Sequence, residues 1–157
     1  MLNYILLFFL ATALCDEQKK PNFVVIITDD QDAVLDGMYT TSPICCPSRA
    51  SFLTGQYIHN HSTKNNSLSG GCYGNKWRHL HEDNTFATVL MNAGYSTFYA
   101  GKYLNQYGVK EAGGPSKVPP GWTEWHGLVG NSVYYDYTIS NNGVPTRSTN
   151  EYLTDVI

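Results

Sequence analysis

The sequence is poor in charge. Asp, Glu, Lys and Arg make up 15% of its 157 residues, and the formal net charge is −3. This balance argues against a polyanion being held by the overall charge of the chain, so we expect no nucleic-acid partner. An anionic substrate would have to be held by cations placed locally.

The sequence also lacks a hydrophobic run long enough to cross a bilayer, internal repeats and low-complexity tracts. The one strongly apolar run covers residues 4–14 and is too short to span a membrane. Ala13-Leu14-Cys15, at its end, resembles a small-residue cleavage site. We therefore expect residues 1–15 to be a signal peptide and the chain to enter the secretory pathway without a membrane span. The alternative is an N-terminal membrane anchor.

Cysteines are few, and their number is odd once a signal peptide is removed. Cys45, Cys46 and Cys72 remain. In an oxidising compartment this suggests that one thiol is reserved for chemistry while the others pair, with each other or elsewhere; the alternative is a leftover thiol. The acceptor triplets Asn60-His61-Ser62 and Asn65-Asn66-Ser67 make Asn60 and Asn65 candidate N-glycosylation sites.

What the sequence does contain is a strand and helix pattern typical of one α/β domain; its length and 42% hydrophobic content suit a globular protein. Residues 23–28 are continuously apolar and β-branched, as in a strand buried on both faces of a parallel sheet. Asp29 and Asp30 follow at its carboxyl end, where open α/β sheets bind ligands. A helix is expected over 47–53, because proline suits a first helical turn and Gly55 would end it.

The remaining elements follow from turn residues and periodicity. We expect a loop over 59–77, then a helix over 85–92 with Asn84 as N-cap and Gly94 as its stop. A strand over 95–100, which ends just before Lys102, and a linker over 111–121 should follow. The last expected elements are a hairpin arm over 133–140 with a turn at 141–143, and a helix from Glu151.

The most unusual string is Cys45-Cys46-Pro47-Ser48-Arg49, with Leu53-Thr54-Gly55 after it. With PNFVVIITDDQD upstream and later segments up to residue 157, it resembles the sulfatase family over residues 21–157. The segment Gly101-Lys102-Tyr103-Leu104-Asn105 resembles both the extracellular heparan endosulfatases and the N-acetylglucosamine-6-sulfatase subfamily. The Ala112-Gly113-Gly114 insertion is more similar to the N-acetylglucosamine-6-sulfatase subfamily.

The resemblance implies an alkaline-phosphatase-like α/β/α sandwich, of which residues 21–157 would be the N-terminal portion of the catalytic domain. It also implies removal of 6-O-sulfate from N-acetylglucosamine in sulfated glycosaminoglycans (heparan sulfate and keratan sulfate). The location implied is the lysosome, reached through the secretory pathway; the alternative is a secreted or cell-surface protein.

In the sulfatase family the motif cysteine is oxidised to formylglycine, which here would be Cys45, and the formylglycine-generating enzyme becomes an expected partner. The hydrated aldehyde carries two hydroxyls on one carbon, so one can attack sulfur and the other can later expel sulfate. The alternative reading of Cys45 is a disulfide or a buried thiol. Cys46 occupies a spacer position and receives no catalytic role.

The resemblance also implies one calcium ion. Asp29 and Asp30 match the family's first two ligands, with the modified Cys45 beside the metal, and adjacent carboxylates suit such a cation. Without that context an Asp-Asp pair is a solvated turn. The remaining ligands are expected downstream of residue 157, so we expect these residues alone to be inactive.

Two cations complete the expected site. Arg49 lies about one helical turn after Cys45 and could hold the aldehyde hydrate or a sulfate oxygen, beside the N–H groups of the helix N-terminus. Lys102 matches the family's sulfate-contacting lysine. Many sulfatases continue Lys-x-His, but here Leu104 stands at the histidine position with Asn105 beside it, which leaves that polar role in doubt. Either cation could instead be an ordinary surface charge.

The histidines carry weaker signals. His59 and His61 follow the motif and are expected at the surface or on the pocket rim, without zinc. Residues 76–81, which include Trp77, form a basic aromatic cluster that is expected in a solvated loop rather than on a glycan.

Other functions stay open at this point. They are an extracellular heparan endosulfatase, a phosphohydrolase of the alkaline-phosphatase type, and a truncated sulfatase that is inactive or only binds glycan.

Peptide mass spectrometry of the mature protein tests the central expectation. The peptide that contains Cys45 should carry an aldehyde at that residue, because the motif directs oxidation there, while Cys46 in the same peptide should be unchanged by this oxidation. An unmodified or disulfide-linked Cys45 would contradict the sulfatase mechanism.

Overall fold

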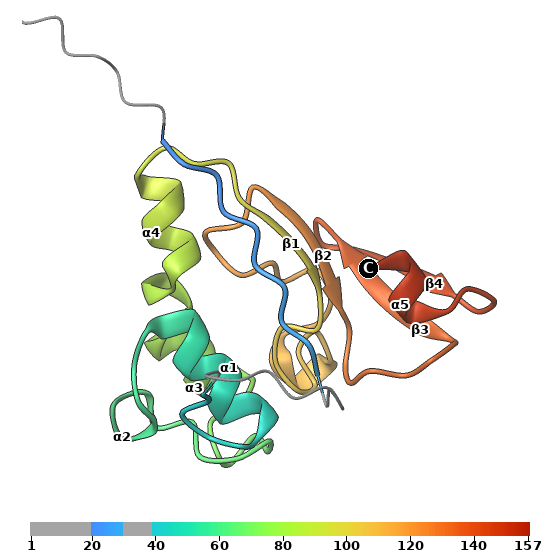
Figure 1. The fold of residues 1–157 in the computed structure, drawn as a ribbon. Coiled ribbons are helices and arrows are strands. Elements are labelled where there is room, and N and C mark those ends of the chain that lie inside the picture. Colours follow the sequence, from blue (N-terminus) through green and yellow to red (C-terminus); the bar gives the residue numbers. More distant parts are fainter. Residues whose placement is uncertain (1–19, 30–38) are drawn as a thin grey trace, which may run out of the picture. The chain divides into compact units, whose positions relative to one another are not determined.

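The structure is a computed structural model that describes residues 20–29 and 39–157 (Figure 1). The chain divides into two compact units, residues 1–32 and residues 33–157. The expected signal peptide over 1–15 and the second aspartate, Asp30, lie outside the described residues.

The strand expected over 23–28 is not formed in the described part of the first unit, so this prediction was wrong. No strand is assigned within residues 20–29, and the apolar side chains from Phe23 to Ile27 are exposed, Val24 to 89%. A strand in a parallel sheet needs neighbours on both sides and a layer over each face. The described residues of the first unit supply neither.

The second unit joins a group of short helices to a four-stranded sheet (Figure 1). In chain order its elements are α1 (Cys45–Thr54), α2 (Ile58–His61), α3 (Asn75–Leu80), η1 (Glu82–Asn84), α4 (Phe86–Asn92), β1 (Phe98–Gly101), η2 (Lys110–Ala112), β2 (Glu124–Leu128), β3 (Tyr137–Asn141), β4 (Val144–Ser148) and α5 (Leu153–Val156). The strands follow the order β1-β2-β3-β4. The β1–β2 pair is parallel and the other two pairs are antiparallel.

Most of the expected elements of this unit are present, with shifted ends. Helix α1 starts two residues before Pro47, and so includes both cysteines of the motif; Gly55 ends it in the left-handed region at φ 67°. Strand β1 ends at Gly101, which places Lys102 directly after it, as expected. The hairpin of β3 and β4 turns at Asn142 and Gly143, whose φ angles of 49° and 90° suit Asn and Gly.

Two expectations about elements of this unit were wrong, and one strand was missed. The loop over 59–77 contains α2 and the start of α3, and helix α4 has Thr85 rather than Asn84 at its N-cap. Strand β2 was not foreseen, because its five residues show no clear pattern by themselves. Its position depends on parallel pairing with β1, in which Tyr99 stands opposite Trp125, 26 residues away.

The core of this unit is built mainly from aromatic rings. Trp77, Tyr103, Tyr107 and Trp125 are each at most 2% exposed, and they pack with Ala50 and Leu53 of α1 and with Leu104 in one cluster. The ring centroids of Tyr103 and Tyr107 lie 4.9 Å apart in an edge-to-face arrangement. Such pairs add about 0.5–1.5 kcal/mol beyond the area that they bury. This cluster therefore fixes the motif helix against the segment that follows β1.

A buried acid lies at the edge of the aromatic cluster. The hydroxyl of Tyr107 donates to Oε1 of Glu82 at 2.7 Å, and Arg78 lies 3.9 Å from the other carboxylate oxygen. Burial raises the pKa of Glu82, while the hydrogen bond from Tyr107 and the charge of Arg78 oppose that rise. Tyr107 is therefore held by both its ring and its hydroxyl.

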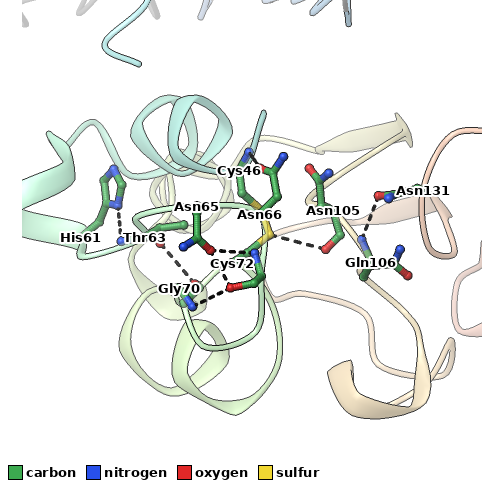
Figure 2. Close-up of a disulfide and its surroundings, with 12 residues drawn as sticks. Cys46, His61, Thr63, Asn65, Asn66, Gly70, Cys72, Asn105, Gln106 and Asn131 are labelled. Atoms are coloured by element: carbon green, nitrogen blue, oxygen red, sulfur yellow. Dashed lines mark hydrogen bonds between the residues drawn. A yellow bond between two sulfur atoms is a disulfide. The ribbon is translucent and has the colours of Figure 1, made fainter. Parts of the chain in front are cut away.

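A disulfide joins the first turn of α1 to the loop that precedes α3. It connects Cys46 and Cys72, whose Cα atoms lie 5.5 Å apart, and both residues are fully buried (Figure 2). Among the described residues, no helix has the length and apolar character needed to cross a membrane.

The double substitution Cys46→Ser and Cys72→Ser should destabilise the natural full-length protein. Closing a loop of 26 residues is worth about 3.5 kcal/mol in the chain-entropy description. We expect a lower midpoint of thermal unfolding by calorimetry. Cys45→Ala, which leaves the disulfide in place, is the control. An unchanged midpoint in the double variant would contradict a stabilising role for the disulfide.

Candidate active site

The candidate site begins with Cys45, the first residue of α1. Its side chain is partly buried, and it is outside the disulfide that joins Cys46 to Cys72. The pairing of the other two cysteines matches one of the arrangements expected from the odd count. The spacer residue Cys46 thus has a structural partner, and a catalytic role for Cys45 stays a prediction.

The N-terminus of α1 is capped from a distance. Its N-cap residue, Ile44, has no side-chain oxygen to offer, and Pro47 has no N–H. The N–H of Cys46 donates instead to Oδ1 of Asn66, at 2.9 Å (Figure 2). The N–H groups at the N-terminus of α1 were expected to bind an anion. The N–H of Cys46 does not serve this purpose here, because it is bonded to Asn66.

Arg49 and Lys102 are brought together, although they are 53 residues apart. Arg49 is 8% exposed, and its guanidinium Nη1 donates to the backbone carbonyl of Lys102. The hydroxyl of Tyr99 donates to the same carbonyl at 2.5 Å. The contact shown for Arg49 is thus with the backbone of the second candidate residue. A direct contact of Arg49 with the aldehyde hydrate or sulfate stays a prediction.

Tyr99 was not predicted from the sequence as a site residue, because a tyrosine within an apolar strand is expected only to pack in the core. Burial raises the pKa of Tyr99 to about 12, and the nearby charge of Arg49 opposes that rise. Tyr99 therefore keeps its proton at neutral pH and remains a donor to Lys102. Its ring also stacks on Trp125, with centroids 4.9 Å apart, which ties this donor to the core.

The position at which many sulfatases carry histidine is held by Leu104, an apolar side chain that can neither donate nor accept a hydrogen bond. Leu104 is fully buried in the core cluster. Its neighbour Asn105 is 7% exposed, and Oδ1 of this side chain has no hydrogen-bond partner within residues 20–29 and 39–157. A buried acceptor without a donor costs about 1–3 kcal/mol.

His61 is buried, so the expected rim position was wrong for this residue. It is 1% exposed; its Nδ1 accepts the N–H of Thr63 at 3.1 Å, and its Nε2 lies 2.9 Å from Oγ of Ser51 in α1. Because Nδ1 accepts, the neutral ring donates from Nε2 to Ser51. Burial and the nearby His81 lower the pKa of His61. His59, in contrast, is exposed.

The basic aromatic cluster over 76–81 is also not a solvated loop. These residues lie mostly in α3, and Trp77 is fully buried in the core. Asn60 and Asn65 are both exposed, as glycan acceptors need to be.

The described residues do not assemble a metal site. Asp29 lies in an exposed bend of the first unit, and within residues 20–29 and 39–157 no group of three or more His, Cys, Asp or Glu side chains could hold a metal ion. Calcium takes six to eight oxygen ligands. The assignment of Asp29, Asp30 and Cys45 to a metal stays a prediction.

Comparison with known proteins gives consistent matches. Residues 28–157 match the sulfatase family. N-acetylglucosamine-6-sulfatase from Homo sapiens is 45% identical over 88% of this chain and 30% of its own length, and the Capra hircus protein of that name is 44% identical over 88% and 29%. The extracellular sulfatase SULF-1 homolog from Drosophila melanogaster is 40% identical over 88% and 14%. The chain thus spans less than a third of these curated relatives.

Two solved structures share the fold. The structure of BT4656 in complex with its substrate D-glucosamine-2-N,6-O-disulfate matches with a TM-score of 0.55 and 26% identity, over 77% of this chain and 21% of that one. A second, from work on glycosaminoglycan metabolism by Bacteroides thetaiotaomicron, matches with a TM-score of 0.54 and 17% identity, over 73% and 26%. They confirm the expected α/β fold of the sulfatase type.

The buried state of His61 predicts a pH-dependent stability. Because its pKa is lowered on folding, the unfolded chain binds a proton first as the pH falls below about 6.5, and the folded state is weakened below that pH. His61→Gln in the full-length protein should therefore reduce the loss of thermal stability between about pH 7.5 and pH 5. His59→Gln, at an exposed position, should not. An unchanged loss in His61→Gln would contradict this prediction.

Proposed function

The chain belongs to the sulfatase family, and on this basis we propose that the protein is a sulfuric ester hydrolase that removes 6-O-sulfate from N-acetylglucosamine in sulfated glycosaminoglycans. One observation carries the proposal. The Cys-x-Pro-Ser-Arg motif opens helix α1, and Arg49 of this motif binds the backbone of Lys102 just after β1. This bond joins the helix that carries the predicted nucleophile to the backbone of the lysine that is predicted to contact sulfate.

Cys45 supplies the nucleophile after its oxidation to formylglycine by the formylglycine-generating enzyme. One hydroxyl of the hydrated aldehyde loses its proton and bonds to sulfur, while the sulfur–oxygen bond to the sugar breaks and the sugar oxygen takes up a proton. The other hydroxyl then loses its proton, the carbonyl re-forms as the carbon–oxygen bond to sulfate breaks, and water hydrates the aldehyde again. The place of Cys45 at the first position of α1, partly buried, suits this role, because the helix fixes the backbone that carries it.

Lys102 is proposed to contact the sulfate through its ammonium group. Its side chain is partly exposed, and its backbone is fixed by the hydrogen bonds from Arg49 and Tyr99. A fixed backbone limits the positions that a flexible lysine can reach, which lowers the entropy lost when it binds the substrate. Arg49 carries the second positive charge of the site.

Calcium is the cofactor that the family resemblance implies. The chemistry of Asp29 and Asp30 suits it, but the described residues provide too few oxygen ligands to hold the ion. We therefore assign no step of the reaction to the metal. Its remaining ligands are proposed to lie outside this sequence.

The choice of sugar rests on the relatives. The N-acetylglucosamine-6-sulfatases match at 44–45% identity, which favours heparan sulfate and keratan sulfate as substrates and the lysosome as location. An extracellular heparan endosulfatase is the second candidate, because the SULF-1 homolog is 40% identical over the same share of the chain. That candidate implies a secreted or cell-surface protein.

Sulfate release from a 6-sulfated N-acetylglucosamine substrate by the natural full-length protein tests the proposal. Cys45→Ala should lower kcat at least about 1,000-fold, because the nucleophile is lost, with little change in thermal stability. Gln56→Ala, an exposed residue just after the motif, is the matched control. Retained activity in Cys45→Ala would remove Cys45 from the mechanism.

The same assay separates the alternatives. Release from the chain end alone indicates the lysosomal type, and release from internal sugars of heparan indicates the endosulfatase. Hydrolysis of phosphate esters without sulfate release would contradict a sulfatase.

A further inference from the structure

Cys46, the residue beside the proposed nucleophile, is held from two directions by one loop. Its sulfur is bonded to Cys72 and its N–H donates to Asn66, so the residues at both ends of the short stretch 66–72 bind Cys46 (Figure 2). Cys46 is fully buried and belongs to the core cluster. The first turn of α1 is therefore fixed by groups that lie at least 20 residues away.

The loop has its own internal framework. Oδ1 of Asn65 accepts the N–H and the hydroxyl of Ser67, at 2.9 and 2.6 Å. The hydroxyl of Ser67 accepts the N–H of Gly70, and the carbonyl of Ser67 accepts the N–H of Cys72, both at 3.1 Å. These bonds hold the loop in one shape, and none of them uses the side chain of Asn66. The side chain of Asn66 is thus left to bind α1.

Asn66 supplies the side-chain acceptor that the N-cap residue of α1, Ile44, does not have. Asn is among the best helix N-caps because its side-chain oxygen accepts an N–H of the first turn, yet Ile44 occupies that place in the sequence. With Pro47 at the third helical position, Cys46 and Cys45 supply the only N–H groups of the first three residues. The bond from the N–H of Cys46 to Oδ1 of Asn66 therefore sets the orientation of the peptide group that joins Cys45 to Cys46.

We propose that Asn66 is a positioning residue for the nucleophile: through the N–H of Cys46 it fixes the peptide group from which the Cys45 side chain is directed at the substrate. This role rests on the proposed sulfatase function. Asn66 touches neither the substrate nor the reacting atoms. Its effect should appear in kcat rather than in KM, because misplacement of a nucleophile slows the chemical step while the cations that bind sulfate are unchanged.

Three variants of the natural full-length protein test the proposal, with kcat expressed per molecule that carries the aldehyde, as counted by mass spectrometry. Asn66→Ala should lower kcat about tenfold and change KM less than about twofold. Asn66→Asp keeps an acceptor oxygen at the same place and should restore kcat to within about twofold of the wild type. Lys64→Ala, an exposed side chain in the same region, should behave as the wild type. The triplet Asn65-x-Ser67 is intact in all three.

A purely structural role would lower thermal stability without changing kcat per aldehyde at a temperature well below unfolding. Wild-type kcat in Asn66→Ala, or equal slowing in Asn66→Ala and Asn66→Asp, would therefore overturn the proposal.

Hydrogen–deuterium exchange over residues 45–49 gives a second readout that needs no turnover. Protection of the Cys46 amide should be lost in Asn66→Ala and kept in Asn66→Asp and Lys64→Ala; unchanged protection in Asn66→Ala overturns the inference. If the wild type releases no sulfate, the proposed function fails, while this exchange pattern still decides whether Asn66 holds the peptide group. If Asn66→Ala does not fold, Asn66→Gln, whose oxygen is displaced by one carbon, replaces it with the same expected loss.

Discussion

The carbonyl oxygen of Lys102 accepts hydrogen bonds from Arg49 and Tyr99, and this junction connects the motif helix to the sheet. Arg49 is nearly buried, and a buried guanidinium is costly unless its N–H groups have acceptors. A helix and a strand end that are 53 residues apart are thus joined by a charge-assisted hydrogen bond. The relative position of Cys45 and Lys102 depends on this junction being intact.

The aromatic core packs against the segments that form this junction. Tyr99 stacks on Trp125 of the neighbouring strand, and Tyr103 packs edge to face against Trp125 at 5.3 Å. Dense packing of rings leaves little freedom for the segment that carries Lys102. Some buried polar atoms of the core lack a hydrogen-bond partner within residues 20–29 and 39–157, however. Among the described residues, the indole N–H of Trp125 and the amide oxygen of Asn105 have no hydrogen-bond partner.

The two ends of α1 are built differently. Its C-terminus ends on Gly55 in the left-handed conformation, a local signal that sequence alone reveals. Its N-terminus depends on Asn66 and on the disulfide to Cys72, which come from the loop before α3. The end of the helix that carries the proposed chemistry is therefore the end that the tertiary structure controls. This arrangement explains how a helix without a good N-cap of its own can present a defined residue.

Local sequence signals were enough to predict the family, the α/β class, the stop of α1 at Gly55, the position of Lys102 just after β1 and the turn at Asn142 and Gly143, because motifs, glycines and turn residues act over a few neighbouring positions. Four features could be seen only in the folded chain: the pairing of Cys46 with Cys72, the bond from Arg49 to the backbone of Lys102, the place of β2 beside β1 and the burial of His61. The exposed segment over 23–28 shows the limit of local pattern, since an apolar run becomes a buried strand only where neighbouring strands and covering layers are supplied. Each of these outcomes depends on contacts between residues far apart in the chain, and their free energy appears only when the fold brings the partners together.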